Sequence, residues 1–592
     1  MATISSKDTS KVFQIQKFLG LNESRDGDTQ LKYGEASEMR NFCITPQFHL
    51  KGRAGLRTVK AFDTPVRGLW CGYVAGEKHL LCAAGGAVWD LTGMPRRIGD
   101  IWDDKTTFFG FDDKVYILNG HEYLFWDGAG FVNVVDGYIP CVVTAAAPAG
   151  GGTTLENVNR LTGKRRVRFS ADGTSVDYHL PEKNLLSVDK VLVAGEAVST
   201  YTAALETGVV TFTSAPLAGN DNVEIYYSVV NLLRPQVEKM RYSESYNGYT
   251  DTRIFLYGDG SSKAIYCGVT ETGKPSADYF PDLFEIQIGS SNTPITGMVK
   301  QYDRLLSFKP DGAYSTSYSS VTLADGTVTA GFYTNPLNRE IGNEAAGQAQ
   351  LVYNYPRTIY ANNIYEWRMA SSAVRDERNA KLISERVQKS MDEADQSKIF
   401  TFDDDGKQEY YVFLNDEAGT ALVNGYITDT WYKYTNLPVV AAARDGNNVY
   451  FGLSNGKVAL FSEDMHSDDG KQIVSEFYSG NMDFGYDYQR KHSSTIWVSL
   501  KPAANARIAI SAKSDRISNY AEKTIFSNMA GFGNVDFNHF SFRTNSAPIM
   551  TRIKLKVKKF VYYKLYIRAD GVANNTTVLG AEIRTRYTGF VK

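Results

Sequence analysis

The residue types that most often carry catalysis or bind metal ions are scattered along this chain of 592 residues. The seven histidines show no HxxxH or HExxH spacing, and the five cysteines contain no CxxC pair, so no zinc site is predicted. Gly456-Lys457 is followed by Val and Gly470-Lys471 by Gln, whereas a phosphate-binding loop needs Ser or Thr after the lysine. The sequence therefore predicts no metal ion, nucleotide or other cofactor.

Two acidic segments point to chemistry more directly, since paired carboxylates hydrolyse glycosidic bonds and clustered carboxylates bind calcium. Ser170-Ala-Asp172-Gly-Thr174 only partly matches an aspartate box of the sialidase type, because the Gly spacing and the Trp are missing. Asp403-Asp-Asp-Gly406 lacks the alternating spacing of an EF-hand loop and favours a hairpin turn. We therefore expect no catalytic residues and a protein that is not an enzyme, although carboxylates far apart in the sequence can converge in space.

The most regular charged pattern lies near the C-terminal end. In Arg552-Ile-Lys-Leu-Lys-Val-Lys-Lys-Phe, basic and aliphatic residues alternate. Successive side chains of a strand point to opposite faces, so the pattern predicts a strand with one basic face and one core face. The candidate contact surface for another subunit or protein is the basic face, which consists of Arg552, Lys554, Lys556 and Lys558. An ordinary solvated strand face is the alternative interpretation.

This basic strand belongs to a chain whose charge is unevenly distributed. Residues 485–592 contain 18 Lys and Arg against 6 Asp and Glu, which gives +12, whereas the whole chain carries a net charge of −2. The remainder of the chain therefore carries −14. An acidic body with a basic end is typical of self-assembly, of an acidic partner or of contact with nucleic acid.

The strands that must position these residues follow a repeat. Residues 65–136 contain two successive units of four short strands, each with a Trp-Asp pair in its third strand, Trp89-Asp90 and Trp126-Asp127. Units of ~35 residues with aromatic and β-branched strands and Gly, Asp or Asn turns are typical of β-propeller blades. Similar hairpins recur as far as residue 483 and predict about seven blades. A ring of blades must close, and residues 13–18 are the predicted closing strand.

Two segments depart from the blade pattern. The linker Thr144-Ala-Ala-Ala-Pro-Ala-Gly-Gly-Gly precedes strands of a small β-sandwich inserted into the propeller. Its basic cluster, Lys164-Arg165-Arg166 with Arg168, predicts a solvated strand edge, and a nucleic-acid patch is the alternative. The predicted all-β protein thus has an N-terminal extended arm (1–65), blades (66–148), an inserted β-sandwich (149–232), blades (233–483) and a C-terminal basic β domain (484–592). Strands at 540–543 and 551–560 are expected in the last part, and a short surface helix within 382–391.

The N-terminal segment carries a resemblance to a known family. Phe18-Leu-Gly-Leu-Asn, Gly34-Glu-Ala, Asn41-Phe and Lys51-Gly-Arg-Ala-Gly stand in this order before the first blade. This order is similar to the start of tail hub or nozzle proteins of short-tailed bacteriophages, also known as tail tubular protein B or packaged-DNA stabilisation protein. Further similar stretches begin at Thr252, Tyr279 and Thr293, so the resemblance covers residues 13–72 and 252–332.

The resemblance implies a virion structural protein that is assembled in the host cytoplasm and located in the phage tail. Such a protein forms a ring, expected to be a homohexamer, that docks on the tail adaptor and portal ring. It retains packaged DNA, forms the channel for DNA ejection, and contacts other tail proteins such as fibres. A receptor- or carbohydrate-binding phage tail protein is the alternative. The N-terminus lacks the apolar core of a signal peptide and no apolar run approaches ~20 residues, so no membrane-spanning segment is expected.

Overall fold

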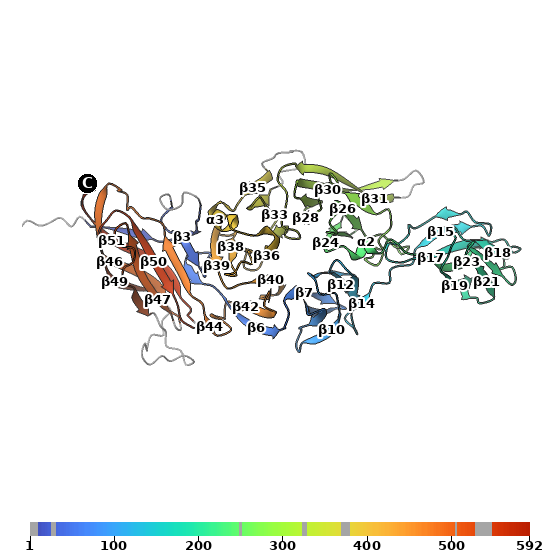
Figure 1. The fold of residues 1–592 in the computed structure, drawn as a ribbon, viewed down its shortest axis with the longest axis horizontal. Helices are drawn as coiled ribbons and strands as arrows, with labels where there is room; N and C mark the ends of the chain where they lie inside the picture. The colour runs from blue at the N-terminus through green and yellow to red at the C-terminus, as the bar shows by residue number, and fades with distance from the viewer. Residues whose placement is uncertain are drawn as a thin grey trace, which may run out of the picture. The chain divides into compact units, whose positions relative to one another are not determined.

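The computed structural model describes residues 10–24, 31–247, 252–322, 328–368, 379–503, 506–526, 547–572 and 574–591. The chain forms two compact units, Met1–Leu69 with Gln350–Lys592, and Trp70–Ala349. Both units consist almost wholly of small, mostly antiparallel sheets (Figure 1). The predicted all-β class, a β-propeller with an inserted and a C-terminal β domain, is confirmed.

Four sheets with the form of propeller blades belong to the second unit. This unit begins at Trp70, within the first strand of the first of these blades. In the second blade, Asp112 and Asp113 both adopt positive φ, as a two-residue hairpin turn requires. Trp126 of that blade is fully buried, and its ring packs edge-on against His79 of the first blade at 4.9 Å. The four blades comprise β7 (Val66–Val74), β8 (Glu77–Ala84), β9 (Ala87–Asp90) and β10 (Arg96–Asp100); β11 (Thr107–Phe111), β12 (Lys114–Leu118), β13 (Tyr123–Trp126) and β14 (Asn133–Val134); β24 (Tyr242–Asn247), β25 (Thr252–Tyr257), β26 (Lys263–Tyr266) and β27 (Glu285–Gln287); and β28 (Gly297–Gln301), β29 (Arg304–Lys309), β30 (Gly312–Thr322) and β31 (Val328–Asn338).

The inserted domain interrupts these blades between the second and third sheets. Its two sheets enclose a core in which the Tyr178 ring packs edge-on against Phe169 at 5.3 Å and against Phe212 at 5.1 Å. A short helix, α2 (Pro235–Glu238), leads back into the blades. The larger sheet contains β15 (Cys141–Ala146), β16 (Thr153–Thr154), β17 (Lys164–Ala171), β19 (Ser187–Val193), β20 (Glu196–Ala197) and β23 (Gly219–Ser228), and the smaller one contains β18 (Asp177–His179), β21 (Tyr201–Ala204) and β22 (Val209–Phe212).

Three further blades belong to the first unit, and the last is completed by a strand from the N-terminal segment. β6 (Gly55–Ala61) pairs antiparallel with β42. The prediction that residues 13–18 close the last blade is therefore wrong, because β1 (Ser10–Ile15) pairs with β51 of the C-terminal domain. The three blades comprise β32 (Gln350–Val352), β33 (Tyr355–Tyr360), β34 (Asn363–Trp367) and β35 (Ala380–Leu382); β36 (Phe400–Asp404), β37 (Glu409–Phe413), β38 (Ala421–Gly425) and β39 (Thr430–Tyr434); and β40 (Val439–Asp445), β41 (Asn448–Leu453) and β42 (Lys457–Ser462) with β6, extended by β43 (Ser467–Asp468) and β44 (Lys471–Gln472).

The described residues of the C-terminal domain form two six-stranded sheets to which both ends of the chain contribute, as the mixture of blue and orange to red strands in Figure 1 shows. Its core includes Phe18, Phe477, Ile496, Val557 and Ile567. One sheet contains β4 (Phe42–Ile44), β5 (Leu50–Gly52), β51 (Thr577–Phe590), β46 (Gln489–Lys501) and β49 (Ile549–Phe560), with β1 beside β51. The other contains β2 (Gly20–Leu21), β3 (Glu35–Arg40), β45 (Ser475–Ser479), β50 (Tyr563–Ala569), β47 (Arg507–Ser514) and β48 (Lys523–Phe526). The strand expected at residues 540–543 lies outside the described residues.

The helix expected within residues 382–391 is present as two short pieces. These are the 3₁₀ turn η2 (Glu385–Val387) and α3 (Gln388–Asp392), and a further 3₁₀ turn, η3 (Gln396–Lys398), follows. Val387 and Met391 are fully buried, as one apolar face of the helix predicts. Of the described residues, no helix is long and apolar enough to cross a membrane.

Candidate functional site

The basic row predicted from the sequence lies along one face of β49. The aliphatic side chains Ile553, Leu555 and Val557 are buried, whereas the basic side chains between them are exposed. In the described part of the chain, β49 is an edge strand whose neighbour in the sheet is β46. The structure therefore places all four predicted residues on the outer face of this sheet; they are Arg552, Lys554, Lys556 and Lys558.

Two further arginines extend this row across the sheet. Lys554 lies opposite Thr495 of β46, and Thr495 lies opposite Arg584 of β51. Residues directly opposed in neighbouring strands share a face, so Arg584 belongs to the same surface as Lys554. Arg586, two residues further along β51, is exposed and lies opposite His492. We use the name basic face for the surface made of Arg552, Lys554, Lys556, Lys558, Arg584 and Arg586.

The sequence analysis missed the two arginines of β51. The signal is present in Glu582-Ile-Arg584-Thr-Arg586, where charged residues alternate with Ile583 and Thr585, both buried in the structure. It is shorter than the row on β49, and the sequence does not show which strands lie side by side.

The basic face also holds a carboxylate, because Glu582 of β51 lies opposite Trp497 of β46, which in turn lies opposite Arg552. Among the residues that the structure describes, no ion pair joins Arg552, Lys554, Lys556 or Lys558 to a carboxylate. Burial lowers the pKa of His492, and the positive charges of Lys558, Lys556 and Arg586 lower it further. Like charges on one sheet face repel each other, so this surface is suited to a partner that brings negative charge.

In the second basic cluster, the three arginines are paired with carboxylates of the chain. The predicted solvated strand edge is wrong, because β17 pairs with both β15 and β23 and so lies inside the sheet. Arg166 donates to Glu224 at 2.8 Å, and Arg168 donates to the same carboxylate at 3.2 Å. Both arginines also pair with Glu271, a residue of the third blade. These contacts lower the pKa of Glu271 and join the inserted domain to that blade.

The acidic segments form turns. Asp403 and Asp404 end β36 and Glu409 begins β37, so Asp403-Asp-Asp-Gly406 is part of a hairpin, as predicted. Asp172 accepts hydrogen bonds from the backbone N–H groups of Thr174 at 2.8 Å and Ser175 at 2.7 Å, which fixes a turn. In the described ranges, no group of three or more His, Cys, Asp or Glu side chains has the geometry of a metal site.

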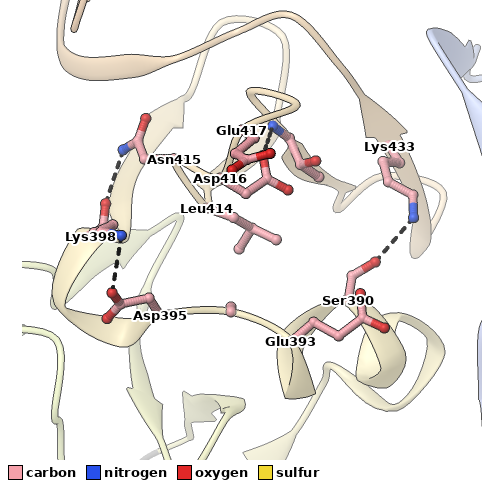
Figure 2. Close-up of a pocket in the computed structure, with 11 residues that line it drawn as sticks. Ser390, Glu393, Asp395, Lys398, Leu414, Asn415, Asp416, Glu417 and Lys433 are labelled. Atoms are coloured by element: carbon pink, nitrogen blue, oxygen red, sulfur yellow. Dashed lines mark hydrogen bonds and ion pairs between the residues drawn. The ribbon is translucent and has the colours of Figure 1, made fainter.

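Figure 2 shows a polar pocket of about 500 Å³ between α3, η3 and the blade β36–β39. Lys433 donates to Ser390 at 3.1 Å, and Asn415 donates to the Lys398 carbonyl at 2.9 Å. The Asp416 carboxylate accepts from the Thr420 backbone N–H at 2.7 Å. These lining groups hold the loops of the blade in place, and we assign no reaction to this pocket.

Comparison with known proteins identifies no family for this chain. No protein-family model matches the chain, and no curated protein matches it. A computationally designed protein, Ika8, is 13% identical with a TM-score of 0.33, and the match covers 69% of this chain and 99% of that one. BamB from Moraxella catarrhalis is 7% identical with a TM-score of 0.31, and the match covers 76% of this chain and 98% of BamB. An exo-β-1,3-galactanase from Phanerochaete chrysosporium is 7% identical with a TM-score of 0.20, covering 58% and 95%.

These comparisons correct one expectation. The absence of catalytic motifs led us to expect a protein that is not an enzyme, and this conclusion is wrong because glycoside hydrolases are among the solved structures that match the chain. They include a family 43 arabinoxylan arabinofuranohydrolase from Bacillus subtilis and a family 32 β-fructofuranosidase from Bombyx mori. The expectation is therefore withdrawn, and the similarity assigns no reaction to this chain.

Proposed function

We propose that this protein is a structural subunit of a short bacteriophage tail, a hub or nozzle component that docks through its basic face. The observation that carries the proposal is the row of four cations on an exposed face of β49, which form no ion pair with a carboxylate of the described residues, in a chain whose remaining part is acidic. The resemblance of residues 13–72 and 252–332 to tail hub and nozzle proteins supports the same class. As in that family, the subunits are expected to form a homohexamer beneath the adaptor and portal ring and to retain packaged DNA.

The chemistry of the basic face favours an acidic protein surface over DNA as its partner. Each phosphate neutralised by a cation adds to a salt-dependent affinity, so a conduit lined with such rows would bind DNA strongly and release it slowly. Exposed charge pairs between proteins contribute only ~0–1 kcal/mol each and mainly fix register and the rate of docking. The proposed partner is therefore a neighbouring subunit or another tail protein.

Charge reversal tests the proposal. Replacing Lys554 and Lys556 together by Glu changes the exposed face and leaves Ile553, Leu555 and Val557 in the core. We expect the variant to fold with a melting temperature close to that of the parent and to be absent from purified particles after complementation of a deletion phage.

A matched control makes the same change of charge elsewhere. Lys183 and Lys190 are exposed in the inserted domain, and the pair Lys183→Glu with Lys190→Glu should enter particles normally. Normal incorporation of the Lys554 and Lys556 variant, with altered DNA retention or ejection, would show that the basic face meets DNA instead.

A further inference from the structure

A second cavity, of about 390 Å³, lies in the first unit between the N-terminal strands and the last two blades. Its volume falls within the range of about 300–1,000 Å³ that small-molecule sites occupy. The walls come from β4 and β5 on one side and from β37, β39 and β42 on the other. The polar and aromatic side chains that matter here are Lys51, Lys407, Glu409, Tyr411, Tyr434 and Phe461, with Glu463 among the lining residues.

One of the lining groups of this cavity is a carboxylate that the protein holds in place. Glu409 accepts hydrogen bonds from the hydroxyl groups of Tyr411 and Tyr432, the latter at 2.5 Å. Both tyrosines are almost completely buried, whereas Glu409 keeps some exposed surface. Burial raises the pKa of Glu409. Each carboxylate oxygen has a further lone pair, so the group can accept hydrogen bonds from a ligand.

The charges around the cavity balance one another. Lys51 donates to Glu463 at 2.7 Å, and Lys407 lies 4.0 Å from the same carboxylate. The formal charges of these two lysines and of the carboxylates of Glu409 and Glu463 add up to zero. Arg53, which also lines the cavity, is paired with Asp468 at 2.6 Å. A strongly charged ligand would upset this balance, so the cavity suits an uncharged molecule.

The cavity offers both hydrogen-bonding partners and rings to such a molecule. Lysine ammonium groups donate, carboxylate oxygens accept, and tyrosine hydroxyls do both. Phe461, Tyr411 and Tyr434 line the wall, with Phe461 and Tyr411 at a ring centroid distance of 6.4 Å. A neutral molecule rich in hydroxyl groups, with C–H faces that pack on aromatic rings, matches all three features. A sugar has these properties.

We propose that this cavity binds one unit of a carbohydrate, with Glu409 accepting hydrogen bonds from adjacent sugar hydroxyls and Lys51 or Lys407 donating at the mouth. The inference stands apart from the proposed tail function, because it depends on residues that the basic face does not contain.

Saturation-transfer difference NMR on the full chain tests this inference. The probes are glucose, galactose, N-acetylglucosamine, lactose and cellobiose, with inorganic phosphate and spermidine as charged competitors. We expect at least one sugar to give a saturable signal that neither charged compound removes. Glu409→Gln keeps the shape of the side chain and should lower the affinity for that sugar at least about tenfold. This is the loss expected for hydrogen bonds to a charged acceptor.

A blocking variant covers the case in which Glu409→Gln disturbs folding. Gln47 lines the cavity and is exposed, so Gln47→Trp should fill the mouth and abolish the signal without touching a buried residue. Glu417→Gln, in the pocket of Figure 2, is the matched control and should bind as the parent does. The inference is overturned if no sugar of the panel binds, if binding survives Gln47→Trp, or if phosphate or spermidine competes.

Discussion

Phe461 of β42 lies opposite Leu56 of β6, so the last blade takes a strand from a segment some 400 residues earlier in the chain. Both side chains are buried. The pairing holds the N-terminal segment on the blade, while the residues before it, in β1 to β5, enter the C-terminal sheets. This one strand therefore ties the blade and the C-terminal domain of the first unit into one body.

The closing strand should be sensitive to a single methyl group at its start. A Cβ atom on Gly55 would lie 2.2 Å from the backbone oxygen of Ser467, so Gly55→Ala forces the backbone to shift. We expect a loss of about 1–3 kcal/mol in the free energy of unfolding. Gly589→Ala, where the added Cβ meets nothing within 4 Å, is the control and should be neutral. Equal unfolding curves for the two variants would contradict this account of the closing strand.

A buried arginine joins two blades of the first unit. Arg357 donates to Glu366 at 3.0 Å and to Asn424 of the next blade at 3.0 Å, and it is 4% exposed. Arg357→Met removes a buried partner of Glu366 and should lower the free energy of unfolding, measured with denaturant, by about 3–5 kcal/mol. Arg368, half-exposed, binds the other oxygen of Glu366, and Arg368→Met should cost about 0–1 kcal/mol. If the two variants lost similar amounts of unfolding free energy, burial of the ion pair would not decide its strength.

Glu244 should make the stability of the second unit depend on pH. Burial raises the pKa of its carboxyl from 4.5 to about 7. The folded state then binds more protons than the unfolded state between about pH 4.5 and pH 7, so stability falls as the pH rises through this window. Glu244→Gln removes the buried charge and should stabilise the protein by about 1–3 kcal/mol at pH 8, with little effect at pH 4.5. Thermal unfolding of both proteins across this range is the check, and a gain that is equal at both pH values would refute the assignment.

The pKa of His492 depends on the charges of the basic face. Because burial and the positive charge of Lys558 both lower its pKa, Lys558→Glu should raise it, whereas Lys501→Glu at the far end of β46 should leave it unchanged. NMR titration of selectively labelled histidines measures both shifts. Since the folded pKa lies below 6.5, the parent protein loses stability as the pH falls below that value. No shift in Lys558→Glu would place Lys558 away from His492.

Local patterns in the sequence predicted the parts of this fold that depend on neighbours in the chain. The alternation in residues 552–558 predicted both faces of β49, and the turn residues predicted hairpins such as that at Asp112 and Asp113. Each of these features follows from the period of two along a strand and from backbone φ, which short stretches of sequence encode.

Pairings between distant strands could not be predicted in the same way. β6 is the closing strand and β1 pairs in a C-terminal sheet, yet both segments alternate similarly, so the local pattern does not tell them apart. The boundary of the inserted domain shows the same limit. Leu161 and Arg160 fall within the predicted insert, yet Leu161 packs in the core of the second and third blades and the Arg160 backbone N–H donates to Phe280. The cavity around Glu409 joins strands that are over 350 residues apart, so no local pattern marks it.

Locating this chain in the virion tests the central proposal most directly. A small tag on the C-terminal end of the chain, imaged by electron microscopy of purified particles, should give density at the tail tip beneath the portal vertex, in six copies. Particles made without the protein should package DNA and then lose it. Density in the fibres or a three-fold arrangement would favour a receptor-binding protein, and stable, filled particles that lack the chain would contradict the proposed role in retaining DNA.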